Sequence, residues 1–152
     1  NYVIMKELYA IRAGLFNERI KTEDISKYGD VTPAFAHKVC FMTYDKINFE
    51  ISNLIYDGKK VKADVIVSIP KLEFDLTYVA SLLSVKDMVE FYKEKENVAG
   101  PEYEQVLLKY YTIALSNMPL TPETFSLTVE KSNGKWQILS DTSEIIKYIK
   151  GE

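Results

Sequence analysis

The side chains best suited to nucleophilic chemistry in this sequence are one cysteine and one histidine. Cys40 and His37 are the only residues of their types, and they are spaced i, i+3 in a segment with helical periodicity. A cysteine nucleophile needs a neighbouring base and a third group that orients the base. The sequence places no such third group beside them, and His37 lies off the apolar stripe of its helix. We therefore expect a surface histidine, a buried inert cysteine and no catalytic residue.

Acid–base chemistry would need a carboxyl group on the apolar face of a strand, where burial raises its pKa. Asp64 and Glu130 alternate with the apolar residues of their strands, so both are predicted on polar faces. Asp75 and Asp87 lie in predicted helices or turns, and an inward orientation of either would supply a buried acid. That acid is the basis of our alternative hypothesis, a small hydrolase or isomerase.

The sequence lacks the signatures of the common enzyme and cofactor classes. It has no glycine-rich phosphate loop, no nucleophile elbow, no histidine pair of the zinc-protease type and no cysteine pair. We therefore expect no metal site and no cofactor. A non-enzymatic role is favoured over an enzymatic one.

Aromatic content is the remaining unusual feature, with eleven tyrosines and one tryptophan. These side chains combine a large contact area with a polar tip, which suits both ligand surfaces and the edges of a core. Trp136 on a predicted hairpin, with Tyr44 and Tyr110 on flanking helices, is our predicted lining of a pocket between sheet and helices. We also expect Trp136 to be largely buried, because it shares a strand face with Ile138.

Several segments have the apolar periodicity of amphipathic helices. They are residues 2 to about 21, a short helix capped by Thr22 and ending near Gly29, a helix opened by Pro33, helices within 72–117 broken near Ser84 and at Gly100-Pro101, and a last short helix carrying Ile145 and Ile149.

Two other segments alternate with period 2, as strands do. Each contains a hairpin signal, Asp57-Gly58 in the first and Asn133-Gly134 in the second. Antiparallel hairpins between helices predict an α+β fold, a strongly bent antiparallel sheet packed against helices, in a single domain spanning 1–152.

The first hairpin also contains a change of phase. Tyr56 follows Ile51 by an odd number of residues, which predicts a β-bulge around Ser52-Asn53 that would curve the sheet.

Charge and hydropathy exclude two classes of partner. The formal net charge is -3, so there is no positive excess to neutralise a phosphate backbone, and we expect no nucleic-acid partner. No apolar run approaches the roughly 20 residues that span a bilayer, so no transmembrane segment is predicted in this chain.

The two hairpins, Phe49 to Ile69 and Phe125 to Leu139, resemble the sheet of nuclear transport factor 2-like domains, the cone-shaped, cystatin-like α+β fold. The turn and tryptophan from Asn133 to Trp136 resemble the last strands of the versions found in bacterial cell-surface lipoproteins. The chain departs from the simplest family pattern by inserting the long helical segment 72–117 between the hairpins.

The resemblance implies a binding or interaction domain located outside the cytoplasm, on the cell surface or secreted. Its partner would be a small molecule or a protein. Members of the family often dimerise through the open face of the sheet, so we expect a homodimer, with Leu54 and Tyr56 on the candidate surface.

Overall fold

The computed structural model describes residues 2–152, which group by their contacts into two compact units. The sheet unit contains the residues up to Glu18, Asp45–Ile69 and Leu120–Glu152, and the helical unit contains Arg19–Tyr44 and Pro70–Pro119. The predicted α+β class is confirmed, whereas a single domain spanning 1–152 stays a prediction.

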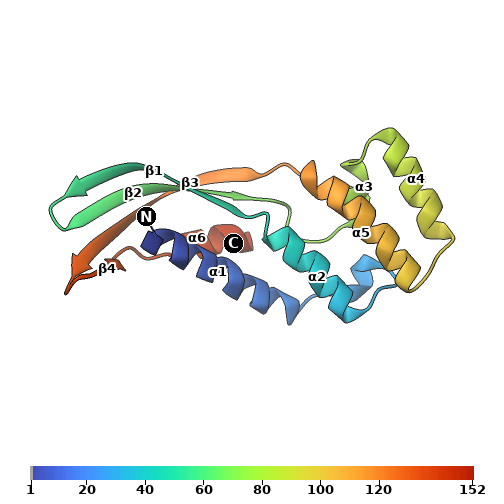
Figure 1. Ribbon diagram of the computed structural model, residues 1–152, viewed down its shortest axis with the longest axis horizontal. Coiled ribbons are helices and arrows are strands. Elements are labelled where there is room, and N and C mark those ends of the chain that lie inside the picture. Colours follow the sequence, from blue (N-terminus) through green and yellow to red (C-terminus); the bar gives the residue numbers. More distant parts are fainter. Residues whose placement is uncertain (1) are drawn as a thin grey trace. The chain divides into compact units, whose positions relative to one another are not determined.

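The sheet unit contains four strands and two helices, and the helical unit contains the other helices (Figure 1). The elements of the sheet unit are α1 (Tyr2–Ile20), β1 (Asn48–Asp57), β2 (Lys60–Ile69), β3 (Thr121–Ser132), β4 (Lys135–Ile138) and α6 (Ser143–Lys150). The last two residues of α1, Arg19 and Ile20, belong to the helical unit. In the helical unit lie the 3₁₀ helix η1 (Ile25–Tyr28), α2 (Pro33–Tyr44), α3 (Leu76–Ser81), α4 (Val85–Glu96) and α5 (Pro101–Ser116).

The strands form one antiparallel sheet in the order β1-β2-β3-β4. Both predicted hairpins are present. Gly58 begins the first two-residue turn with φ 59°, and Asn133 and Gly134 form the second with φ 52° and 77°. In the second turn both central residues have positive φ, which is the geometry that favours Asn-Gly in tight hairpins. The pairing of β2 with β3 joins the two hairpins into one sheet.

The predicted bulge lies in β1. The register with β2 shifts between Ser52 and Ile55, and Asn53 between them has φ 52°. Asparagine tolerates this left-handed conformation better than most residues. The predicted bulge is thus confirmed, and it returns Tyr56 to the face of the sheet that carries Phe49.

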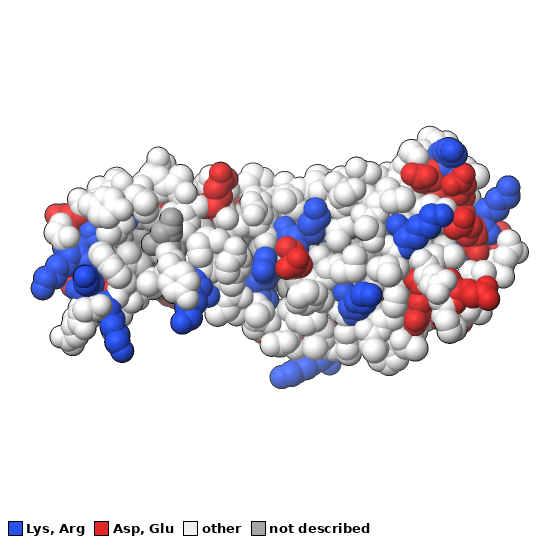
Figure 2. All heavy atoms as spheres, in the orientation of Figure 1, with Lys and Arg blue, Asp and Glu red and all other residues white. Residues whose placement is uncertain are grey.

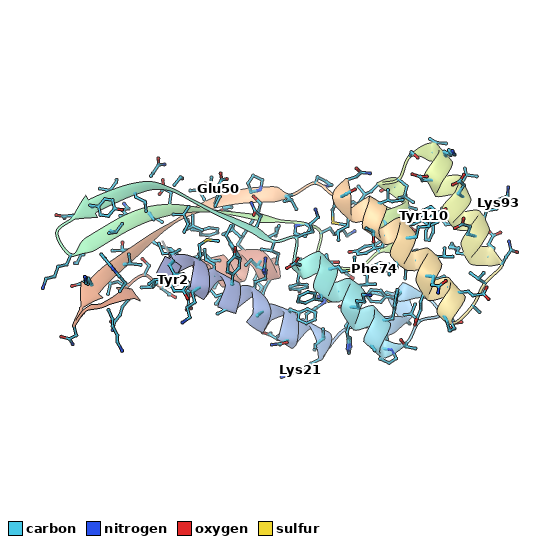
Figure 3. All side chains as sticks on the ribbon, viewed as in Figure 1. Tyr2, Lys21, Glu50, Phe74, Lys93 and Tyr110 are labelled. Atoms are coloured by element: carbon cyan, nitrogen blue, oxygen red, sulfur yellow. The ribbon has the colours of Figure 1, made fainter. Side chains whose placement is uncertain are left out.

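One face of the sheet, here called the covered face, packs against α1 and α6 (Figure 1). The ring of Phe49 contacts Tyr9 of α1 at 6.0 Å between centroids, and Phe125 contacts Tyr148 of α6 at 5.7 Å. The opposite face, here called the polar face, carries Glu50, labelled in Figure 3 on the side away from α1. The buried residues of the unit come from α1, α6 and the covered face: Ile4, Leu8, Ile11, Leu15, Ile47, Phe49, Val61, Ala63, Val65, Val67, Leu127, Val129, Ile145 and Ile149.

Polar contacts fasten the two helices to the sheet unit. The Arg12 guanidinium donates to the carbonyl oxygen of Ile47 at 3.0 Å and lies over the ring of Tyr9. The hydroxyl of Tyr148 donates to the carbonyl of Thr121, where β3 begins. These bonds hold α1 near the start of β1 and α6 near the start of β3.

The helical unit is built around α5, which contacts α2, α3 and α4. Its core is rich in aromatic rings: Tyr28 stacks on Phe74 with centroids 4.2 Å apart, and Phe91 packs on Tyr110 at 5.3 Å. Figure 3 labels Phe74 and Tyr110 among these side chains. The buried rings add large apolar contact area to this small core.

Most helix boundaries follow the sequence signals. The breaks predicted near Ser84 and at Gly100-Pro101 separate α3, α4 and α5, and Ser84 caps α4 by accepting from the amide of Asp87. The prediction of Thr22 as a cap was wrong. Asp24 caps η1 instead, because its carboxylate accepts from both the amide and the hydroxyl of Ser26.

Candidate functional site

A pocket of about 310 Å³ opens on the covered face near the two hairpin turns. Its volume is at the lower end of the range typical of small-molecule sites. The strands supply its floor and sides, and the first residues of α1 complete it. The lining residues are Tyr2, Val3, Leu54, Tyr56, Val61, Val129 and Trp136.

The register of the sheet explains why these side chains meet. Tyr56 pairs with Val61, Val61 with Val129, and Val129 with Ile138, so one row crosses all four strands. Trp136 lies two residues before Ile138 and therefore points to the same face. Without the bulge in β1, Tyr56 would point to the polar face and the pocket would lose one wall.

The rim of the pocket is aromatic and exposed to solvent. The exposed fractions are 77% for Tyr2, 73% for Tyr56 and 40% for Trp136, whereas Val61 and Val129 at the floor are buried. Figure 3 labels Tyr2 at the start of α1, beneath the strands. Exposed aromatic side chains around an apolar floor are the arrangement found at sites that bind apolar groups.

The prediction that Trp136 is largely buried was wrong. The turn fixes the register as expected, but α1 begins at this end of the sheet and covers the ring only in part. The side chain points to the predicted face without enough helix above it to exclude water.

Tyr44 and Tyr110, the other two predicted ligand-binding residues, lie in the helical unit. Tyr44 ends α2 and is 6% exposed, and Tyr110 in α5 is 1% exposed against Phe91. The pocket near the hairpin turns therefore contains Trp136 alone of the three residues. A ligand-binding role for Tyr44 and Tyr110 stays a prediction.

Leu54 and Tyr56, predicted on the open face of the sheet, line the pocket on the covered face instead. The bulge that the sequence indicated is the cause, because it turns this end of β1 towards α1. Self-association of the chain stays a prediction. The part of it that placed these two residues on the open face was wrong. Their change of phase was the sequence signal for the position of these two residues in the pocket.

The carboxyl groups of the described chain whose pKa values are displaced all have lowered values, the opposite of what a buried general acid requires. The pKa of Asp75 is lowered chiefly by a hydrogen bond from the backbone amide of Tyr78. The pKa of Asp141 is lowered chiefly by a hydrogen bond from the backbone amide of Ser143. The pKa values of Glu73 and Asp24 are also lowered, first by side-chain hydrogen bonds from Lys27 and Ser26. Asp75 caps α3 and points to solvent.

Asp64 lies on the polar face as predicted. It pairs with Ser52 in β1 and with Ser126 in β3, and its carboxylate accepts from the side-chain amide of Asn53 at 2.9 Å. It therefore supports the bulge and is turned away from the pocket.

Cys40 is buried in the helical unit and adjoins a carboxylate. Its Sγ lies 4.0 Å from Oε2 of Glu23, which also accepts from Nε of Arg19 at 2.7 Å. The Glu23 side chain is 1% exposed. Burial, followed by the charge of Glu23, raises the pKa of the thiol to about 11. The thiol therefore stays protonated near neutral pH and is a poor nucleophile, as the sequence predicted.

Among the described residues, 2–152, no three histidine, cysteine, aspartate or glutamate side chains are grouped so that they could hold a metal ion. None of the described helices combines the length and the apolar character that crossing a membrane requires.

Comparison of the chain with known proteins gave no match. No family model, no curated protein and no solved structure is similar enough to be paired with it.

Proposed function

We propose that the chain is a non-enzymatic binding domain that takes up an apolar group in the pocket near the hairpin turns. The observation that carries the proposal is the lining, which consists of aliphatic and aromatic side chains without a carboxylate. The alternative hypothesis, a hydrolase or isomerase that uses a buried acid, would need a carboxyl group in the pocket, and this lining has none. The enzymatic alternative therefore has no support in this pocket.

The partly exposed rim gives the proposed binding a source of free energy. Tyr56 and Trp136 would exchange water for contact with a ligand, and aromatic side chains commonly dominate binding energy when they are buried in this way. The floor residues Val61 and Val129 are already buried, so they supply shape more than binding energy.

The chain contains a built-in probe for the test, because Trp136 is its only tryptophan. We expect 1-decanol, an uncharged apolar probe, to change the fluorescence of Trp136 in a saturable way. Tyr56→Ala should weaken this binding about tenfold, the effect of losing one aromatic contact of about 1.4 kcal/mol.

The matched control is Ile55→Ala, one residue away on the polar face of the same strand. It should leave the affinity for 1-decanol unchanged. An emission spectrum that does not respond to 1-decanol would contradict the proposal, and so would equal weakening by the two variants.

We also propose that the sheet unit is a nuclear transport factor 2-like domain displayed outside the cytoplasm. The bulged β1, the two antiparallel hairpins and the helix α1 on the covered face support this assignment. The helical unit is a departure from the simple pattern. Mass spectrometry of the native N-terminus tests the location: a lipid-modified cysteine or a processed signal supports it, and an unprocessed start contradicts it.

A further inference from the structure

We propose that this pocket binds amphiphiles with one apolar chain and an anionic head group, with the head group held by lysines at the hairpin turns. The inference rests on the proposed function, because it assigns a ligand class to the same pocket.

Lys131 is the charged residue placed closest to the pocket by the register. It lies directly opposite Trp136 in the β3–β4 pairing, and it follows the buried Val129 by two residues. Side chains directly opposite each other have Cβ atoms roughly 5 Å apart and share a face. The long stem of Lys131 therefore runs beside Trp136 on the covered face, and its ammonium group can stay in water at the rim.

A lysine of the first turn extends the positive charge around Lys131. The amide of Lys131 donates to the carbonyl of Lys59 at 3.0 Å, which ties the second hairpin to the turn of the first. Lys135 begins β4 directly after the second turn, but it precedes Trp136 by one residue and therefore points to the polar face. Figure 2 shows blue side chains gathered at this end of the sheet.

These lysines are not neutralised by ion pairs in the described part of the chain. Lys59, Lys131 and Lys135 have no carboxylate oxygen within the 4.0 Å of an ion pair there, unlike Lys147 and Lys150 of the same unit. The acids nearest in sequence, Asp57 and Glu130, both lie opposite Lys60 on the polar face. The charge on the pocket side is therefore positive.

An anionic head group at this rim would gain attraction without being buried. The apolar floor would make a buried charge costly, whereas an exposed charge pair costs little desolvation. An apolar chain in the pocket with its anionic group at Lys131 satisfies both requirements. The same chemistry is offered by a free amphiphile and by an anionic lipid in a bilayer.

The test compares three probes with the same chain and different head groups, each below its micelle concentration. They are dodecyl phosphate, dodecyl maltoside and dodecyltrimethylammonium, and the signal is the fluorescence of Trp136 in the full chain. We expect dodecyl phosphate to bind at least tenfold more tightly than the cationic probe at low salt. The preference should shrink as salt screens the exposed charges.

Two variants locate the preference. Lys131→Gln should weaken binding of dodecyl phosphate about two- to fivefold, the effect of losing one exposed charge pair, and leave dodecyl maltoside unchanged. Lys62→Gln is the control, because Lys62 lies on the polar face of β2, opposite Ile55 and Thr128. Equal loss in the two variants would overturn the proposal.

The outcomes separate this inference from the proposed function. Equal affinity for the three probes overturns the anionic preference and leaves an apolar pocket standing. No response to any of these probes or to 1-decanol overturns both.

A further arm identifies the source of the ligand. Flotation with vesicles of phosphatidylcholine alone and with added phosphatidylglycerol shows whether the anionic group comes from a bilayer. Lys131-dependent binding to the anionic vesicles, in addition to binding of monomeric dodecyl phosphate, supports a bilayer lipid, and binding of the monomer without the vesicles supports a free amphiphile.

Discussion

The two units differ in how they use their largest aromatic clusters. In the helical unit Tyr28, Phe91 and Tyr110 are almost completely buried, whereas in the sheet unit Tyr56 and Trp136 are exposed around a pocket. The high aromatic content of the sequence therefore has two causes. Rings stabilise a small helical core in one region and offer a contact surface in the other.

The first prediction compares the loss of stability when one ring is removed from each unit. Phe91→Ala should lower the free energy of unfolding by about 3–5 kcal/mol, because it leaves a cavity beside Tyr110. Trp136→Ala should cost about 1 kcal/mol or less, since its ring already contacts water. Denaturant titration followed by circular dichroism measures both. A loss of several kcal/mol in Trp136→Ala would show that this ring belongs to a core.

The second prediction concerns the close packing of the helical unit. Gly29 has φ 90°, and a Cβ there would collide with the hydroxyl of Tyr103, which donates to the carbonyl of Tyr28 at 2.9 Å. Gly29→Ala should therefore cost about 2 kcal/mol or more in the free energy of unfolding.

The control for that change lies in the sheet unit. Gly14 is in the middle of α1, and a Cβ there would meet no atom within 4 Å. Gly14→Ala should stabilise the protein by up to about 1 kcal/mol, because alanine favours helix. Denaturant midpoints of the two variants that move in the same direction would contradict this part of the account.

The third prediction uses the buried thiol of the helical unit. The folded pKa of Cys40, about 11, lies above its ordinary value of 9.0, so folding favours the protonated thiol. Its contribution to stability is complete below pH 9 and is lost as the pH rises towards 11. Between pH 9 and 11, the free energy of unfolding should therefore fall less steeply with rising pH in Cys40→Ala than in the parent protein.

Tyr111 is a neighbouring group whose titration overlaps this window. Burial raises its pKa from 10.0 to about 12, so its contribution is lost between pH 10 and 12 in both proteins and cancels when the two are compared. Identical slopes for Cys40→Ala and the parent protein between pH 9 and 11 would show that the thiol is not held in the protonated form.

The smallest effect is expected on the polar face of the sheet. Ile55→Ala should change the free energy of unfolding by less than about 0.5 kcal/mol, because its side chain is exposed and lies outside the pocket. Denaturant titration beside Trp136→Ala gives the comparison within one unit.

The secondary structure and the sheet followed from local signals in the sequence. Period-2 alternation, Asn133-Gly134 and the change of phase at Tyr56 predicted the hairpins and the bulge, because each depends on neighbouring residues. The strand order was left open by the helical segment between the hairpins, since the pairing of β2 with β3 depends on residues far apart in the chain.

The site was harder to predict than the fold. The exposure of Trp136 depends on where α1 begins above the sheet, which strand periodicity does not contain. Tyr44 and Tyr110 were chosen for their residue type, and the structure gives both a place in the helical unit. Tyr56, Val61 and Val129 lie side by side because of the register between β1, β2 and β3, and the sequence did not predict the pairing of β2 with β3.

The central claim is that ligands bind to the sheet unit and not to the helical unit. Hydrogen exchange of the full chain, with and without saturating 1-decanol, tests it most directly. We predict that 1-decanol slows exchange in residues 54–61 and 129–136 and in the first turn of α1. Exchange in α4 should not change, although Val85 and Val89 are also exposed apolar residues. Protection in α4 without protection at the hairpin turns would contradict the account.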